Sequence, residues 1–180
     1  APRPIAFVSS CSAAGIGNLA PFSFFTAGGS NPPSLVFCAV NDRQGRQKDT
    51  VRNIEETGEY VISTVSAPMA ARMNQASFEY PSEVDEFDVA GFTRAPSLRV
   101  APPGVAESPV RIECRLAEIV RHGTGAQASN YVIGEILVIH VDAAVCTDGL
   151  PDNAKLQQIG RLGADRSEEY TSELQSRLHL

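Results

Sequence analysis

The chain contains no tryptophan, no C-x-x-C pair and no apolar run that approaches the length of a membrane span. A transmembrane helix needs about 18 or more consecutive apolar residues, so we expect no membrane contact. No cysteine lies at metal-ligand spacing from another cysteine or from a histidine, which argues against a metal site. We expect small buried thiols in a reducing compartment, and therefore a cytoplasmic protein. The cysteines are Cys11, Cys38, Cys114 and Cys146.

Positive charge is also scarce. The 180 residues include 15 Lys and Arg against 21 Asp and Glu, a net charge of −6. Binding to nucleic-acid phosphates needs clustered basic residues, so this balance excludes a general nucleic-acid binder. A small anionic ligand needs only one or two local charges and is not excluded. The apolar fraction of 43% and the length indicate one globular domain with its own core.

The two ends of the sequence differ from the rest. The chain starts inside an expected strand, without methionine or a signal peptide, which indicates a truncated or processed N-terminus. From residue 166 onward it is polar and resembles the translation of a sequencing-library adapter; an amphipathic helix is the alternative. We therefore expect a domain over residues 1–165 and a tail over residues 166–180 that does not belong to the fold.

Most of the expected elements are strands. Between Val110 and Leu116 apolar and charged residues alternate, which is the period of a half-buried strand. Pro21 interrupts another apolar run and predicts a bulged or edge strand. The strands follow one another mostly without helical crossovers, which favours an antiparallel barrel. We expect strands over residues 4–11, 19–26, 35–40, 60–65, 110–116 and 131–141, with a hairpin loop at 122–130.

Short helices are expected between these strands. Residues 49–58 predict a helix that Asp49 or Thr50 caps and that a final glycine ends. A second helix is expected over residues 67–76, with a proline in its first turn. A third, acidic helix over residues 82–90 would present its charges to solvent. The fold class is therefore mainly β with short helices.

The segment from Arg3 to Ser23 combines a strand that ends in two hydroxyls, a turn of small residues and a second strand with a proline. Small side chains let a planar ring approach the backbone closely, and backbone N–H and C=O groups can bind the polar edge of such a ring. The proline removes a ladder donor and leaves neighbouring backbone groups for a ligand. An ordinary hairpin is the alternative for this segment taken alone.

A second segment, Arg46 to Thr50, comes directly before the first expected helix. A helix N-terminus presents unpaired N–H groups and a partial positive charge, which suit a phosphate. Lys48 adds a full charge and Thr50 a hydroxyl donor, whereas Asp49 would cap the helix or accept from a ligand hydroxyl. A plain capped helix is the alternative.

No other motif indicates chemistry. Residues 123–126 resemble half of a dinucleotide fingerprint, but a strand follows where that fingerprint needs a helix. The sequence lacks a nucleophile elbow, a Walker loop and a zinc-protease motif. His140 and Arg161 are weaker candidates for residues that line a ligand site, since a strand histidine is usually structural and an arginine is common on surfaces. We therefore predict no catalytic side chain and no metal ligand.

Together these segments resemble the flavin reductase-like family of FMN-binding split barrels. The matching stretches run in order from Pro2 to about Gly163, and the most specific are NLAPFSFF and KDTVRNI. The resemblance implies a homodimeric Greek-key split β-barrel that holds FMN at or near the dimer interface. It departs from the family at both ends: residues usually present before PRPIA are absent, and Ala164 and Asp165 stand where a Gly-Tyr-type ending is usual.

Carried over by position, the resemblance implies a set of flavin contacts. One segment ends the first strand, a second lines the isoalloxazine ring and a third holds the phosphate and ribityl chain. Two later positions match residues near the cofactor. The implied cofactor-binding residues are Ser9, Ser10, Asn18, Ala20, Pro21, Phe22, Ser23, Lys48, Asp49, Thr50, Asn53, His140 and Arg161.

The implied activity is that of an oxidoreductase in which hydride passes from NADH or NADPH to the flavin. The flavin is FMN, with FAD as the alternative, and the protein supplies orientation and electrostatics. Two other functions stay open. One is a flavin-carrying electron-transfer or sensing protein without reductase turnover, and the other is a β-barrel interaction module without a cofactor.

Overall fold

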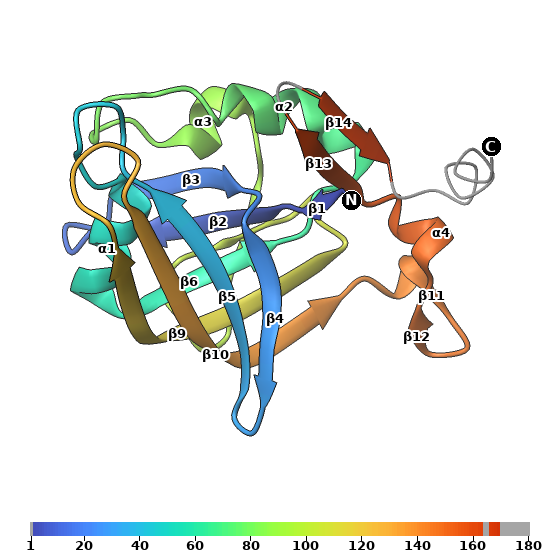
Figure 1. The fold of residues 1–180 in the computed structure, drawn as a ribbon. Helices are drawn as coiled ribbons and strands as arrows, with labels where there is room; N and C mark the ends of the chain where they lie inside the picture. The colour runs from blue at the N-terminus through green and yellow to red at the C-terminus, as the bar shows by residue number, and fades with distance from the viewer. Residues whose placement is uncertain (1, 164–165, 170–180) are drawn as a thin grey trace, which may run out of the picture.

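The computed structural model describes residues 2–163 and 166–169, and its main element is a sheet of seven strands (Figure 1). The order across the sheet is β3-β2-β6-β9-β10-β5-β4, and every neighbouring pair is antiparallel. Each expected strand corresponds to a strand of this sheet, except that the strand expected over residues 19–26 is wrong: these residues divide between two strands, with Ser23 and Phe24 between them. Its strands are β2 (Ala6–Cys11), β3 (Gly17–Phe22), β4 (Phe25–Ser30), β5 (Pro33–Val40), β6 (Glu59–Ser63), β9 (Val110–His122) and β10 (Ser129–Val141).

Strands β3 and β4 lie at opposite edges of the sheet, although only Ser23 and Phe24 separate them in sequence. The sheet must therefore curl until its two edges approach each other. Two register shifts between β9 and β10 contribute to this curvature, since a bulge bends its strand. The predicted antiparallel barrel is confirmed, and so is the edge position of the strand that contains Pro21.

One hydrophobic cluster fills the inside of the curled sheet, and helix α1 (Asp49–Thr57) covers it with Val51 and Ile54. At its centre the Phe37 and Tyr60 rings pack edge to face, with centroids 5.7 Å apart. Gly134 on β10 makes room for the tyrosine, because a Cβ at that position would lie 1.8 Å from the Tyr60 hydroxyl oxygen. The position therefore requires glycine for steric reasons.

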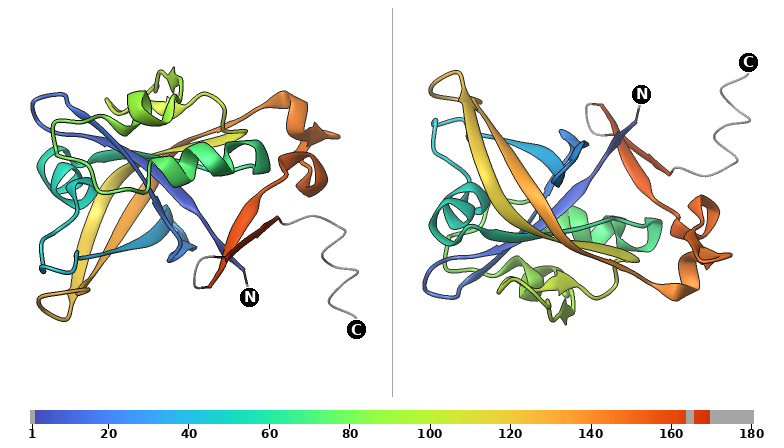
Figure 2. Two further views of the ribbon diagram at one scale, coloured as in Figure 1. Left: turned by 90° about the horizontal axis from the view of Figure 1, so that it is seen from above. Right: turned by 90° about the horizontal axis from the view of Figure 1, so that it is seen from below.

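A second cluster lies on the other face of β2 and β3. Phe7 points into it while Val8 points into the first cluster, as the two-residue period of a strand dictates. The Phe7 and Phe92 rings pack with centroids 5.2 Å apart. The elements η1 (Ala67–Met69), α2 (Ala70–Gln75) and α3 (Glu86–Ala90) cover this cluster, as Figures 1 and 2 show.

The helix expected over residues 49–58 is α1, and Gly58 ends it in the left-handed conformation at φ 74°. Its predicted cap is wrong. The N-cap residue is Lys48, whose side chain makes no capping hydrogen bond. Asp49 lies inside the first turn and pairs with Arg52, and the Thr50 hydroxyl accepts a hydrogen bond from β3 instead. The two side chains expected to cap the helix therefore contact Arg52 and Asn18 instead of the N–H groups of the first turn.

The two later helices are shorter than expected. Residues 67–76 divide into η1 and α2, and the helix expected over residues 82–90 covers only Glu86–Ala90. Asp85 caps α3 by accepting from the Phe87 N–H at 2.9 Å. The prediction that this acidic stretch faces solvent is wrong at Glu86, which is 7% exposed. Its carboxylate accepts the outward N–H of Leu19 on the edge strand β3.

The remaining elements are short. β1 (Arg3–Pro4) pairs with β13 (Ile159–Gly163), which also pairs with β14 (Arg166–Glu169). β14 falls within the predicted tail. The rest of that tail, residues 170–180, and residues 164–165 before it lie outside the described residues. The domain boundary at residue 165 therefore stays a prediction. No helix within the described part of the chain is long and apolar enough to cross a membrane. The other elements are β7 (Arg94–Ala95), β8 (Gly104–Val105), η2 (Ala143–Val145), β11 (Cys146–Thr147), β12 (Leu150–Pro151) and α4 (Asn153–Leu156).

Candidate functional site

A cavity of about 310 Å³ lies between β3, the first turn of α1 and the connection from α2 to α3, at the upper left of Figure 1. Its volume falls in the range of small-molecule sites. We call residues 76–82 of that connection the 76–82 segment. The cavity is lined by Asn18, Ala20, Pro21, Phe22, Asp42, Arg46, Gln47, Lys48, Asp49, Thr50, Arg52, Ala76, Ser77, Phe78, Glu79, Tyr80, Pro81, Ser82 and Glu86.

The cavity brings together the two segments that the sequence singled out separately. The β3 side contributes four of the predicted residues, which run from Asn18 to Phe22, and the turn before α1 contributes Lys48, Asp49 and Thr50. The β3 wall is largely apolar, with a small side chain at Ala20. The α1 wall carries charge and a hydroxyl. One cavity therefore offers an apolar surface and a polar end on different elements.

A buried hydrogen-bond network holds the two walls against each other. The Asn18 amide donates to the Thr50 hydroxyl at 2.8 Å and to the Ser10 hydroxyl at 3.5 Å. The Asn53 amide also donates to Ser10, at 3.3 Å. Ser10 and Asn53 do not line the cavity, so these two predicted residues support the two that do. Because all four side chains are buried and bonded, the network fixes the position of β3 relative to α1.

Three cations line the polar end, and each is paired with a carboxylate. Arg46 Nε lies 2.6 Å from Asp42, and Arg52 pairs with Asp49. Lys48 Nζ lies 3.0 Å from Glu79. Desolvation raises the pKa of Asp42, but hydrogen bonds from Arg46 and Gln44 outweigh it and hold that pKa below its usual value. The cavity thus carries positive groups within reach of a ligand, balanced by nearby carboxylates.

Glu86 is a buried carboxyl in the wall of this cavity. Its Oε2 accepts the Leu19 N–H at 2.9 Å. Burial raises the pKa of Glu86, and the negative charges of Asp85 and Asp49 add to this effect against the hydrogen bond from Leu19. The neutral form of the Glu86 carboxyl is therefore favoured more strongly here than it is for a glutamate exposed to water.

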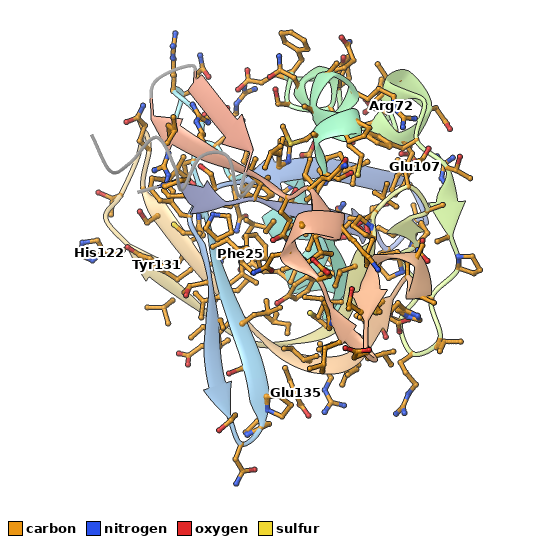
Figure 3. The ribbon with its side chains drawn as sticks, turned by 90° about the vertical axis from the view of Figure 1, so that its right-hand side faces the viewer. Phe25, Arg72, Glu107, His122, Tyr131 and Glu135 are labelled. Atoms are coloured by element: carbon orange, nitrogen blue, oxygen red, sulfur yellow. The ribbon has the colours of Figure 1, made fainter. Side chains whose placement is uncertain are left out.

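The 76–82 segment is held at both ends. On the α2 side, Arg72 donates to Glu107 at 3.1 Å and to the Gly91 carbonyl at 2.9 Å, so α2 is attached to the end of α3. Figure 3 labels Arg72 beside Glu107. On the α1 side, Arg52 donates to the Ser82 hydroxyl at 3.1 Å. The wall formed by this segment is therefore fixed by side chains from outside it.

Four predicted residues lie away from the cavity. Ser9 points to the opposite face of β2 from Ser10 and donates to the Pro103 carbonyl. Ser23 lies in the bend between β3 and β4. His140 is paired with the buried Glu113 at 2.6 Å, and Arg161 lies on β13 opposite Arg3. None of the four lines the cavity.

Sequence reasoning missed the third wall. The sequence pattern places Glu86 on a solvated face and predicts no role for Phe78 or Glu79. The available signal was the aromatic and proline residues Phe78, Tyr80 and Pro81 within an otherwise polar connection. Those residues indicate that the segment packs against the protein, but they do not identify the elements that it contacts.

The chain is similar to known proteins in sequence and in structure. A family model described as the flavin reductase like domain matches residues 1–154. An uncharacterised protein of Halalkalibacterium halodurans is 35% identical over 171 residues, which cover 94% of this chain and 82% of the relative.

Solved structures are similar as well. Nitrilotriacetate monooxygenase component B from Bacillus cereus superposes with a TM-score of 0.89 at 30% identity, covering 96% of this chain and 86% of that one. The flavoredoxin of Desulfovibrio vulgaris superposes with a TM-score of 0.81 at 26% identity, covering 95% and 88% respectively. These matches confirm the predicted family resemblance and the split-barrel fold class.

Proposed function

Because the chain belongs to the flavin reductase-like domain family, we propose that it binds FMN and acts as an oxidoreductase that passes hydride from NADH or NADPH to the flavin. The observation that carries the proposal is the shared cavity. Residues 18–22 of β3 and residues 46–50 before α1, which lie far apart in sequence, line the same space. A ligand with a planar ring at one end and a phosphate at the other requires this combination.

The residues present fit FMN. At the polar end Lys48 and Arg46 supply positive charge, Thr50 supplies a hydroxyl, and the first N–H groups of α1 have no partner within the helix. At the other end Ala20 and Pro21 offer a flat apolar surface. The Asn18 NH2 group donates to Thr50 and Ser10, so the residue offers its amide oxygen as an acceptor for a ring N–H. We assign the phosphate to the first end and the ring to the second.

When it is bound, the flavin supplies the redox chemistry by accepting hydride from a reduced nicotinamide and passing electrons on. The chain's own residues bind and orient. The network behind Asn18 and Thr50 keeps the two walls at a constant separation, and Glu86 holds the Leu19 N–H so that the edge strand stays in place. This division requires no catalytic acid or base.

The test begins with the absorbance spectrum of the purified protein. We expect flavin bands, or their appearance when FMN is titrated in, with FAD and riboflavin as comparisons. NADH or NADPH is then added with excess flavin, and oxidation of the nicotinamide is followed. Purified protein that neither carries flavin nor binds added FMN contradicts the proposal.

A second candidate function is a flavin-carrying electron-transfer or sensing protein without reductase turnover. The similarity to a flavoredoxin supports it. The same cavity serves both functions, so the assay of nicotinamide oxidation separates them. Flavin binding with no nicotinamide oxidation above the rate of free flavin favours this second function.

A homodimer is part of the proposal. On β10 the side chain of Val132 faces the interior, so the neighbouring Tyr131 lies on the outer face, opposite Cys38 on β5 and Val120 on β9. Tyr131 is 40% and Val120 42% exposed. Figure 3 labels Tyr131 close to His122, the last residue of β9. We propose that a second copy covers this face. Sedimentation equilibrium of the wild type and of Tyr131→Asp tests it, with a monomeric wild type as the contradicting result.

A cytoplasmic location is likewise proposed. All four cysteines are free thiols in the structure, as is typical of a reducing compartment. Fractionation of the source cells with an antibody against the chain tests this location.

A further inference from the structure

Glu79 lies in the middle of the 76–82 segment and reaches across the cavity to α1. Its Oε1 lies 3.0 Å from Lys48 Nζ. The proposed function assigns this lysine to the flavin phosphate. In the structure, therefore, a carboxylate of the protein occupies the position next to Lys48 where a phosphate oxygen is expected.

The pairing of Lys48 differs from that of the other two cations in the cavity. Arg46 pairs with Asp42 four residues away, and Arg52 pairs with Asp49 three residues away. Both of these pairs lie within one wall. Lys48 and Glu79 are 31 residues apart and belong to opposite walls. A phosphate that enters the cavity therefore leaves the first two pairs in place and competes with Glu79 for the lysine.

The competition favours a phosphate but not by a large factor. The Lys48 side chain is 37% and the Glu79 side chain 69% exposed, and an ion pair this exposed to water contributes little net stability. A flavin phosphate carries a higher charge and more acceptor oxygens than a carboxylate. It displaces Glu79, but the displaced carboxylate remains nearby and repels it.

We propose that Glu79 is an internal competitor for the phosphate of the flavin, which lowers the affinity for FMN and speeds its release. The inference rests on the proposed function and deepens it. It assigns to one residue of the 76–82 segment an influence on how fast bound flavin exchanges. A chain with a neutral residue at this position would retain FMN longer.

The test compares the wild type with Glu79→Gln and with Glu83→Gln as the matched control. Glu83 belongs to the same connection and is exposed, and it lies outside the cavity lining. FMN and riboflavin are titrated into each protein by fluorescence, and FMN release is timed by dilution. We expect E79Q to bind FMN about two- to fivefold more tightly, with slower release, and to bind riboflavin as the wild type does. E83Q should match the wild type for both ligands.

A second comparison separates the loss of the Glu79 charge from a change in the fold. The effect of E79Q on FMN affinity is measured again with Lys48→Gln present. We expect the gain from E79Q to be smaller in the K48Q background, because the competition for the lysine is then absent and only the repulsion between Glu79 and the phosphate is relieved. An unchanged FMN affinity in E79Q, an equal gain in E83Q or an equal gain for riboflavin overturns the inference. A wild type that binds neither flavin overturns the proposed function instead, so the two failures are distinguishable.

Discussion

Asn18 on the edge strand β3 donates a hydrogen bond of 2.8 Å to the Thr50 hydroxyl in the first turn of α1. These residues lie 32 positions apart, and each was assigned to a different part of the proposed ligand. Their contact is what turns two separate sequence segments into one site. It also makes the site sensitive to a residue that needs no direct contact with the phosphate.

Replacing Asn18 with alanine should weaken both the fold and FMN binding. The change leaves the buried Thr50 hydroxyl without its amide donor and removes one of the two amide donors to Ser10, at a cost of about 1–2 kcal/mol in the free energy of unfolding. We expect FMN affinity to fall about tenfold. Urea unfolding and FMN titration measure the two effects, with Asn74→Ala, an exposed residue of α2, as the control. Wild-type FMN affinity in N18A would exclude the assigned role of the network.

Replacing Lys48 with glutamine should separate phosphate recognition from ring recognition. The variant lacks the charge assigned to the phosphate, so FMN affinity should fall about tenfold and depend less on salt, because a screened attraction is lost. Riboflavin affinity should stay near that of the wild type. The control is Arg43→Gln, which removes an equal charge from an exposed position outside the cavity lining. Equal losses for riboflavin and FMN would contradict the assignment of the phosphate end.

Replacing His140 with glutamine should affect stability rather than flavin binding. Burial raises the pKa of Glu113, but hydrogen bonds from the Leu98 and Arg99 N–H groups and from His140 outweigh it and hold this pKa below its usual value. A lowered folded-state pKa gives stability that is present above the ordinary pKa, about 4.3, and is lost as pH falls through the lowered one.

H140Q should therefore lose about 1–2 kcal/mol at neutral pH, and the difference from the wild type should narrow in acid once Glu113 is protonated. Chemical unfolding between pH 3 and pH 7 measures it, and FMN titration at pH 7 is the comparison. A large loss of FMN affinity with unchanged stability would place His140 in the site after all.

Replacing Gly134 with alanine should destabilise the interior of the barrel. The new methyl group would meet the Tyr60 hydroxyl oxygen at 1.8 Å, and Tyr60 is fully buried. Overpacking of this kind costs about 1–3 kcal/mol. Gly29→Ala is the control, because its nearest neighbour would be 3.6 Å away. Thermal unfolding curves compare the two variants, and equal midpoints would contradict the steric argument.

The strands could be predicted because their evidence is local. Alternation between Val110 and Leu116 indicates a half-buried strand whatever its partner is. In the structure the strand continues to His122, because its pairing with β10 extends that far. The alternation of apolar and charged residues is lost after Leu116, so the sequence does not predict this extension. The cap of α1 was predicted wrongly for the opposite reason: Asp49 and Thr50 are good capping residues locally, but distant partners use their side chains.

The cavity could be predicted only in part. Its two walls carry recognisable segments, whereas the third depends on contacts that no local pattern encodes. The Glu86 carboxylate binds a backbone group 67 positions away, and Glu79 binds a lysine 31 positions away. Acidic residues in a polar stretch are usually solvated, so without the fold nothing distinguishes these two from their neighbours.

The placement of β3 and β4 at opposite edges of the sheet has a mechanical consequence. Their edges are joined by covalent chain, because only two residues connect Phe22 to Phe25. Three successive Cα–Cα steps reach at most about 11 Å, so the Cα atoms of Phe22 and Phe25 cannot move further apart than this while the backbone is intact. Any movement of β3 that admits or releases a ligand is therefore limited by its connection to β4. A displacement of β3, which forms a wall of the cavity, also displaces β4 at the opposite edge of the sheet.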